Sequence, residues 1–303
     1  MKLKWALLTV LFIITTVLTG CEPLTVLDPK GPVSKIQADI IMISVWTMAF
    51  VVIVVMALFA IIVWKYRASK QNDEYEPPHI EGSVALEIFW TAIPIIIVAF
   101  LSFVTVKGTY GVEAIANDYE EEPLVIYATA SNWKWNFSYP EEDIETVNYV
   151  FIPTNRPVEF RLYAYGPMAS FWVPQLGGQK YAMEGMVNKL TLAADFPGEY
   201  SGRNASFSGE GFAEQTFNVK ALPQDEYEQW VDEIKSTAEP LTEEKFNDLL
   251  KPGHLGQLTF TGTHLGFAPA PEGLHGQGGT SDTEETSDMS DMSDMSDMSN
   301  MKE

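Results

Sequence analysis

Two long apolar stretches, separated by a short polar segment, limit what this chain can fold into. Residues 40–64 contain no charged side chain, and residues 84–106 contain only one, that of Glu87. A helix needs about 20 apolar residues to cross the hydrocarbon core of a bilayer, and both stretches exceed that length. Neither shows the polar stripe that a helix on the surface of a soluble domain would carry. The sequence therefore predicts a transmembrane hairpin over residues 39–106, with spans at about 40–64 and 84–106, rather than two buried helices of a globular domain.

The charges beside the two spans predict how the hairpin is oriented. Lys65, Arg67 and Lys70 follow the first span, whereas the opposite flanks carry Asp39 and Lys107. Basic residues gather on the cytoplasmic side of membrane proteins, which places the loop 65–83 inside. The residues after the hairpin then lie on the outer side of the membrane.

The N-terminal residues resemble a secretory signal. Lys2 and Lys4 precede the apolar run 5–18, which ends in Leu18-Thr19-Gly20-Cys21. Small residues before a lone cysteine resemble a bacterial lipobox, which implies a signal peptide over 1–20, acylation of Cys21 and a lipid-anchored exterior segment over 21–38. The alternative is an uncleaved first membrane helix. Proline and glycine are expected to keep the exterior segment irregular, and a single cysteine excludes an intrachain disulfide.

The sequence after residue 123 changes to short strand-like runs separated by turn residues. This spacing predicts an all-β sandwich or small barrel. Residues 133–139 alternate aromatic with polar, so one strand face would carry Trp133, Trp135 and two further rings, forming a core or interface stripe. From Lys107 onward the sequence has 12 basic and 33 acidic residues, within a total charge of −22. Such a surface repels nucleic acid and anionic lipid headgroups.

The order of these features resembles subunit II of the haem–copper respiratory oxidases. The resemblance covers residues 39–222 and rests on the hairpin, the W-x-W-x-F strand and the run Val173-Pro174-Gln175-Leu176-Gly177. It implies that the exterior domain, residues 107–222, is cupredoxin-like. Cytochrome c oxidase members of this family hold a dinuclear copper there with two cysteines, two histidines, a methionine and a glutamate carbonyl.

This sequence has none of those copper-binding side chains. The first histidine position of the family pattern holds Ala169, and the remaining ligand positions hold Asn204, Ser206, Ser208, Phe212 and Gln215. Soft thiolates hold such copper, and asparagine and serine cannot replace them. The four histidines, residues 79, 254, 264 and 275, all lie outside residues 107–222. We therefore expect no copper and no other cofactor in this chain.

A copper-free member resembles the quinol oxidase branch of the family. That resemblance implies a subunit of a Gram-positive menaquinol oxidase in a bacterial cell membrane, coupled to proton translocation. It also implies that haem and copper lie in a partner subunit I, with further small membrane subunits. Two alternatives remain: a cytochrome c oxidase subunit, which would need two cysteines in residues 202–209, and a free-standing lipoprotein that binds a partner or copper.

Glu87 is the one charged residue within the spans. Its position alone suits either a carboxylate in the first turn of a helix or a proton-relay residue. The run Glu87-Ile88-Phe89-Trp90-Thr91 resembles the family's E-x-x-W-T, which implies a role in proton uptake into subunit I. Trp133 resembles the tryptophan that receives electrons in copper-bearing relatives; without copper, Trp133 and Trp135 are expected to serve in packing or docking.

The C-terminal part is expected to be short helices followed by a tail. Residues 223–250 show helical spacing, with one apolar face made by Tyr227, Trp230, Val231 and Ile234, within a helical segment 223–270. Thr242 before two acids predicts the start of the second helix. Residues 271–303 become acidic, with methionine at every third position from 289 to 301. A disordered acidic tail is favoured over a Cu(I)-collecting one.

Overall fold

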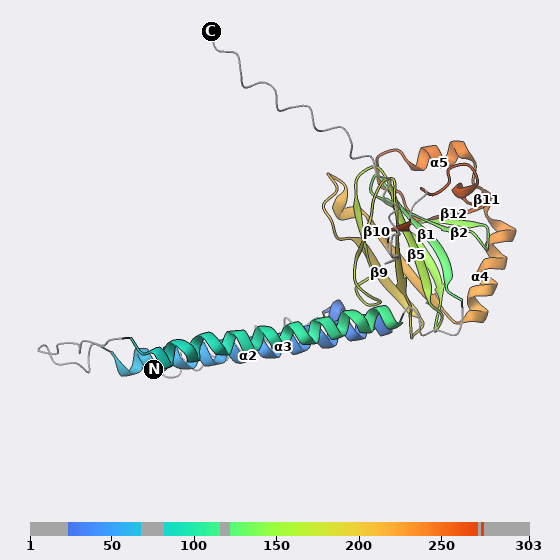
Figure 1. Ribbon diagram of the computed structural model, residues 1–303. Coiled ribbons are helices and arrows are strands. Elements are labelled where there is room, and N and C mark those ends of the chain that lie inside the picture. Colours follow the sequence, from blue (N-terminus) through green and yellow to red (C-terminus); the bar gives the residue numbers. More distant parts are fainter. Residues whose placement is uncertain (1–23, 68–81, 116–121, 272–273, 276–303) are drawn as a thin grey trace, which may run out of the picture.

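The computed structural model describes residues 24–67, 82–115, 122–271 and 274–275. Two long helices lie side by side and lead into a β-rich domain at one end (Figure 1). These helices are α2 (Pro32–Lys65) and α3 (Val84–Ile115), preceded by the short helix η1 (Thr25–Leu27). Both are long and apolar enough to cross a membrane. The predicted signal peptide, Cys21, most of the loop 65–83 and nearly all of the tail 271–303 lie outside the described residues.

The two helices extend further toward the β-rich domain than the predicted spans. The helix α2 begins at Pro32 rather than at residue 40, so the segment 21–38 is not irregular throughout. Gly31 is the N-cap, and Pro32 stands at the first helical position, where its missing N–H costs nothing. A helix of 34 residues is about 51 Å long, so its outer turns project beyond a bilayer core of about 30 Å. The helix α3 runs without a break through Pro94.

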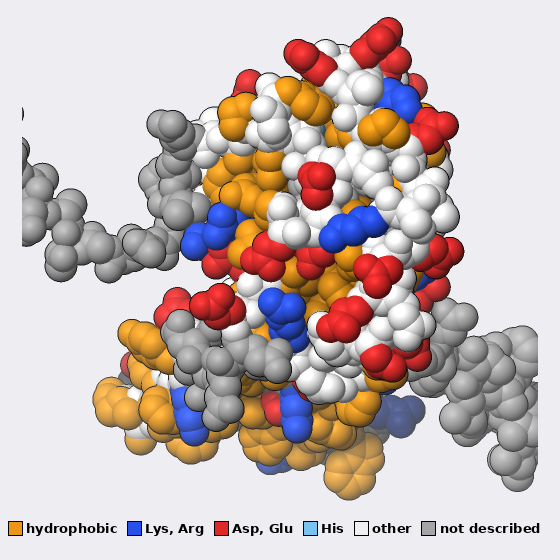
Figure 2. Space-filling view, turned by 90° about the vertical axis from the view of Figure 1, so that its right-hand side faces the viewer, with side chains coloured by type: hydrophobic (Ala, Val, Ile, Leu, Met, Phe, Trp, Pro, Cys, Tyr) orange, Lys and Arg blue, Asp and Glu red, His pale blue; other side chains and the backbone are white. Residues whose placement is uncertain are grey.

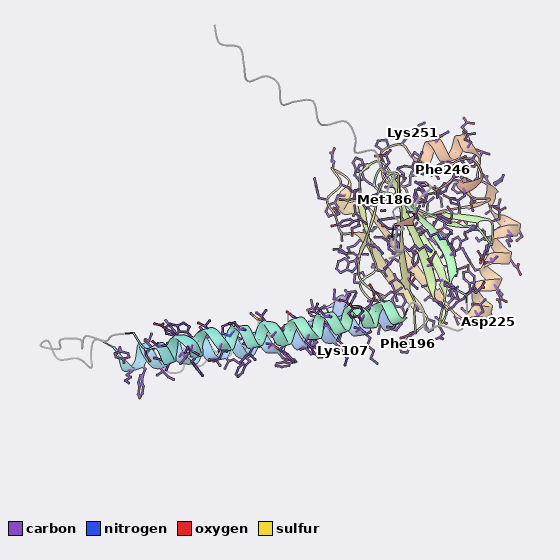
Figure 3. All side chains as sticks on the ribbon, viewed as in Figure 1. Lys107, Met186, Phe196, Asp225, Phe246 and Lys251 are labelled. Carbon is purple, nitrogen blue, oxygen red and sulfur yellow. The ribbon has the colours of Figure 1, made fainter. Side chains whose placement is uncertain are left out.

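The start of α2 is bonded directly to the β-rich domain. Lys30 N donates to Gln175 O at 2.8 Å, and Ser34 Oγ donates to the same carbonyl at 2.6 Å. A Cβ at Gly31 would lie 2.1 Å from Ala193 O, so only glycine allows this approach. The Val173–Gly177 motif noted in the sequence thus forms part of the joint between the hairpin and the domain. Figure 3 shows Lys107 of α3 and Phe196 of the domain near this joint.

The β-rich domain contains two sheets. The larger has the strand order β11-β12-β3-β2-β1-β5-β8-β13, and the smaller has the order β4-β10-β9-β6-β7. The strands are β1 (Leu124–Ser131), β2 (Lys134–Tyr139), β3 (Ile144–Val147), β4 (Tyr149–Pro153), β5 (Val158–Tyr165), β6 (Ala169–Trp172), β7 (Lys180–Ala182), β8 (Val187–Leu192), β9 (Gly198–Asn204), β10 (Thr216–Leu222), β11 (Glu239–Pro240), β12 (Leu258–Thr261) and β13 (Leu274–His275).

Aromatic rings fill the space between the sheets. Trp135 and Phe137 of β2 are fully buried, and both contact the rings of Phe171 and Phe217 from the smaller sheet. The alternating run 133–139 therefore forms part of the core. Trp133 departs from this pattern, because Asn132 and Trp133 adopt positive φ and form the two-residue turn between β1 and β2.

The C-terminal part folds onto the sheets instead of forming only a helical segment. The helix α4 (Gln224–Thr237) packs its predicted apolar face into the core, where Trp230 stacks on Phe151 at 4.5 Å. The helix α5 (Glu243–Leu249) begins at the predicted cap, Thr242, whose side chain accepts from Lys245 N. Beyond α5, β12 pairs with β3 and extends the larger sheet, and the short helix η4 (His264–Gly266) follows. The β-rich domain therefore extends past Leu222, the boundary expected from the sequence.

Candidate functional site: the loop between β9 and β10

Three of the positions that resemble copper ligands come together in the loop between β9 and β10. Asn204 Nδ2 donates to Ser208 Oγ at 2.9 Å and to Gln215 Oε1 at 2.8 Å. Asn204 ends β9, Ser208 lies in the loop, and Gln215 directly precedes β10. The short helix η3 (Phe212–Glu214) closes the loop and lies at the edge of the domain in Figure 1.

The rest of the network saturates the polar atoms of these side chains. Asn204 Oδ1 accepts from Ser170 N at 2.8 Å and from Ser206 N at 2.9 Å. Gln215 Nε2 donates to Lys134 O at 3.2 Å. Asn204 and Gln215 are both buried. The amides thus hold the loop by bonding to each other and to its backbone.

The remaining aligned positions contribute no polar side-chain contact to this centre. Ala169 is buried at the start of β6, and Phe212 is half-buried, with its ring 5.7 Å from that of the exposed Phe207. Amide, hydroxyl and apolar side chains do not fit a dinuclear copper, which requires soft thiolates and imidazoles. Among the described residues, no group of three or more His, Cys, Asp or Glu is placed to hold a metal ion.

Removing the central amide is expected to loosen this loop. Asn204→Ala would leave Ser170 N and Ser206 N without their acceptor, and Gln215 Oε1 would keep only the longer bond from Ser208 Oγ, at 3.4 Å. Buried groups left unpaired in this way cost about 1–3 kcal/mol, and urea unfolding of the full chain measures the loss. Asn218→Ala is the matched control, because its amide donates to Glu199 in an exposed pair and should cost less than about 0.5 kcal/mol. Equal unfolding midpoints for the two variants would contradict the stabilising role of the network.

The two tryptophans of the W-x-W-x-F run occupy different environments. Trp135 is fully buried, which suits packing and leaves no surface for docking. Trp133 is half-buried; its Nε1 donates to Ser208 O at 3.2 Å, and its ring covers Gly211, where a Cβ would lie 2.4 Å from Trp133 Cδ2. Trp133 therefore packs against the loop that contains the aligned ligand positions.

A buried lysine connects this loop to the C-terminal segment. Lys134 is 1% exposed, and its Nζ donates to the carbonyls of Lys251 at 2.6 Å and Gly253 at 2.9 Å. Burial lowers the pKa of Lys134. Asn132 Nδ2 donates to Leu250 O and Asn148 Nδ2 to Leu255 O, each at 2.7 Å. Side chains of the β-rich domain thus hold the backbone of residues 250–255, which lie at the end of the domain away from the hairpin, as Lys251 and Phe246 show in Figure 3.

The sequence placed all four histidines outside the β-rich domain, but His275 lies in β13 of the larger sheet and His264 lies inside the domain. Its side chain is fully buried against β2, β3 and β5. His264 Nδ1 lies 2.7 Å from Glu145 Oε1, and Nε2 lies 2.5 Å from Tyr163 Oη. Ser138 Oγ also bonds to Glu145 Oε2, at 2.9 Å. The alternation of Leu258-Thr259-Phe260-Thr261, typical of a half-buried strand, was the available signal that this segment joins the sheet.

Glu87 lies in the first turn of α3, at the end of the hairpin far from the β-rich domain. It lines an open groove of about 390 Å³ along one face of α3, together with Val84, Ile88, Thr91, Ala92 and Ile95. Glu87 and Thr91 are the only residues of this lining with polar side chains. Within the described residues, the groove is formed by α3 alone, so its open side can receive another helix.

Comparisons with known proteins agree along most of the chain. The family model described as "Cytochrome C oxidase subunit II, transmembrane domain" matches residues 31–107. "Quinol oxidase subunit 2" of Bacillus cereus is 49% identical over 252 residues, which are 82% of this chain and 87% of that protein. "Quinol oxidase subunit 2" of Bacillus subtilis is also 49% identical, over 90% of this chain and 83% of the relative. A crystal structure of the periplasmic domain of cytochrome oxidase subunit II from Bradyrhizobium japonicum is 21% identical, with a TM-score of 0.37, covering 38% of this chain and 95% of that one.

Proposed function

The chain belongs to the quinol oxidase subunit 2 family, and from this premise we propose that its complex takes electrons from a membrane menaquinol without copper in this subunit. It is thus one subunit of an oxidoreductase complex. The observation that carries the proposal is the loop between β9 and β10. In this loop, hydrogen bonds join the side chains of Asn204, Ser208 and Gln215. These are three of the positions that resemble the copper ligands of the family's cytochrome c oxidase members. With no electron-accepting metal in this loop, the donor meets the complex elsewhere, in a partner subunit that holds the haem and copper.

The hairpin anchors the chain and provides the surface for those partners. Outward-facing Ile, Val, Phe and Trp side chains cover α2 and α3 along their length. Such a surface suits lipid tails or the helices of other membrane subunits. With the loop 65–83 on the cytoplasmic side, the β-rich domain lies outside a bacterial cell membrane. Acylation of Cys21 after removal of residues 1–20 would add a second anchor at that side.

The face of the domain opposite the hairpin is strongly acidic. Figure 2 looks onto this face and shows Asp and Glu side chains spread over it, including the region of α4. Such a surface repels nucleic acid and anionic headgroups, so the domain projects away from the membrane instead of lying on it.

Oxygen uptake by the purified complex tests the proposed donor. Rapid uptake with a menaquinol analogue, together with no uptake from reduced cytochrome c, is the expected result. Uptake from cytochrome c would overturn the electron path inferred from the loop. A haem-free, monomeric preparation would instead favour a free-standing lipoprotein.

We further propose that Glu87 takes up protons for the partner subunit. Ionisable side chains within membrane spans are costly and therefore usually functional, and the groove on α3 that Glu87 lines is open to a neighbouring helix. Glu87→Gln keeps the size of the side chain and removes its ability to carry a proton. Oxygen uptake should fall by roughly a hundredfold or more, the scale of a lost proton-transfer group, with haem content unchanged.

Asp39→Asn is the matched control for this variant. Asp39 is an exposed carboxylate on α2 at the opposite, outer end of the hairpin. Its replacement should leave turnover unchanged. If Glu87→Gln turns over as fast as Asp39→Asn, Glu87 serves only as a first-turn carboxylate of α3.

A further inference from the structure

A tyrosine, a histidine and a glutamate form a continuous hydrogen-bonded array inside the β-rich domain. Tyr163 Oη lies 2.5 Å from His264 Nε2, and His264 Nδ1 lies 2.7 and 2.8 Å from the two oxygens of Glu145. Glu145 and His264 are 0% exposed, and Tyr163 is 1% exposed. The ring of Phe246 stacks on His264 at 4.4 Å with an interplanar angle of 6°, which covers the imidazole on one face.

The bonding partners fix where the protons of this array lie. Glu145 accepts from His264 N at 3.0 Å and from Ser138 Oγ at 2.9 Å, as an ionised carboxylate does. Its bond to His264 therefore takes the proton on Nδ1, and Nε2 is left as an acceptor. Tyr163 then donates its phenolic proton to Nε2. Burial raises the pKa of Tyr163, so the phenol keeps its proton at neutral pH.

Tyr127 connects this array to an open cavity. The rings of Tyr127 and Tyr163 meet edge to face with centroids 6.3 Å apart. Tyr127 is half-buried and lines a cavity of about 360 Å³ together with Arg161, Val187, Leu265 and Pro269–Pro271. Only the ring of Tyr127 would therefore separate a small molecule in this cavity from Tyr163.

We propose that Tyr163, His264 and Glu145 form a proton-coupled redox site, which reduces one-electron oxidants of the oxygen-radical class that reach the cavity beside Tyr127. Tyr163 gives one electron to the oxidant through Tyr127, and its O–H bond breaks as the proton moves to His264 Nε2. The products are the reduced oxidant, a neutral tyrosyl radical and an imidazolium held by Glu145. A small soluble reductant such as ascorbate then supplies one electron, and Nε2 returns the proton to the phenolate oxygen.

The charges around the two tyrosines favour a radical on Tyr163 over one on Tyr127. A phenol that loses an electron becomes a strong acid, so a base already hydrogen-bonded to it makes the oxidation easier. Tyr163 has such a base in His264, and the nearby Glu145 carboxylate stabilises the positive charge that forms. Tyr127 instead accepts a hydrogen bond from the Arg161 guanidinium at 2.8 Å, a cation that opposes loss of an electron. When the oxidant removes an electron from Tyr127, Tyr163 therefore replaces that electron, and the radical remains on Tyr163.

Photo-oxidation of the purified full chain in detergent tests this proposal. Flash-generated ruthenium(III) tris-bipyridine, with an irreversible acceptor for the flash electron, serves as the oxidant, and transient absorption and electron paramagnetic resonance detect the radical. The expected result is a long-lived tyrosyl radical that forms more slowly in D₂O than in H₂O and disappears when ascorbate is added. Tyr163→Phe should lose this long-lived radical while its His264–Glu145 pair keeps the domain folded.

Tyr165→Phe is the matched control, since its ring lies 5.7 Å from that of Tyr163 but bonds to Ala268 O instead of a base. It should retain the radical. His264→Gln keeps an acceptor for Tyr163 but removes the base, so the radical lifetime should shorten. A long-lived radical that persists in Tyr163→Phe, or its absence from the unmodified folded chain, would overturn the proposal. The same rate in D₂O and H₂O would also exclude the proton transfer.

Discussion

Replacing Glu145 with leucine is expected to destabilise the β-rich domain by about 3–5 kcal/mol, the usual cost of removing one partner of a buried pair. The carboxylate accepts hydrogen bonds from Ser138 Oγ, His264 N and His264 Nδ1, and all of these groups are inaccessible to water. Leucine would leave His264 N unpaired, and Ser138 Oγ and His264 Nδ1 would keep only each other, at 3.1 Å. Because His264 belongs to the segment after β12, the loss should also release the C-terminal part from the larger sheet.

Two measurements check this expectation on the full chain. Urea unfolding followed by tryptophan fluorescence should show a much lower midpoint for Glu145→Leu, and limited trypsin digestion should cut faster after Lys245 and Lys251. Glu159→Leu is the matched control on β5, because this carboxylate pairs with Arg161 and Lys189 in partly exposed bridges worth about 0–1 kcal/mol. Similar midpoints and digestion rates for the two variants would show that the pair with His264 does not hold the C-terminal part.

The features that local pattern determines were predicted from the sequence. The hairpin follows from the length of two apolar runs that contain almost no charged residues, and the all-β domain follows from short strands between turn residues. The apolar face of α4 and the cap at Thr242 also agree with the structure. In each case neighbouring residues carry enough information, because the periodicity or the cap is a property of a single element.

The grouping of three residues in the loop between β9 and β10 came from a different kind of information, the resemblance to a family pattern. Nothing in the types of Asn204, Ser208 and Gln215 marks them as neighbours, and only alignment with a family pattern grouped them. The structure brings these three together through direct side-chain bonds, whereas Ala169 and Phe212 make no polar side-chain contact there. The amides are suited to bonding each other, which explains how the loop keeps its shape without the ligands that the pattern requires.

The features that sequence reasoning missed depend on contacts between distant residues. The outer turns of α2 form because Lys30 N and Ser34 Oγ donate to the Gln175 carbonyl, which lies far along the chain. His264 lies 119 residues after Glu145, in a part of the chain that was expected to be a helical segment. Trp133 left the aromatic stripe because the two-residue turn between β1 and β2 required positive φ at its position. The spacing of hydrophobic residues along the chain cannot by itself predict such contacts between distant residues.

Alkaline pH is expected to unfold the β-rich domain steeply, because three buried tyrosines keep their protons only in the folded state. Burial raises the pKa values of Tyr139, Tyr163 and Tyr227 well above the usual value. Tyrosines in the unfolded chain ionise near pH 10. The stability that these groups provide is therefore complete below about pH 10 and is lost as pH rises above it. Each contributes about 1.4 kcal/mol per pH unit, so the three together contribute about 4 kcal/mol per unit.

Lys134 changes the stability with pH in the opposite direction to the tyrosines, and over a different pH range. Burial lowers its pKa, so stability gained from Lys134 increases as pH rises from its folded-state pKa to the unfolded value near 10.4, and then stops. Above that value this opposing contribution from Lys134 ends. The free energy of unfolding of the full chain, measured in urea at about pH 9, 10 and 11, should therefore fall sharply in the last interval.

Two tyrosine variants distinguish burial from a general effect of alkali. Tyr227→Phe should reduce the slope above pH 10 by about 1.4 kcal/mol per pH unit, since one buried phenol is removed. Tyr110→Phe should leave the slope unchanged, because Tyr110 is 69% exposed on α3 and is not one of the buried phenols. A flat free energy between about pH 10 and 11, or equal slopes in the two variants, would show that the buried phenols do not control alkaline stability.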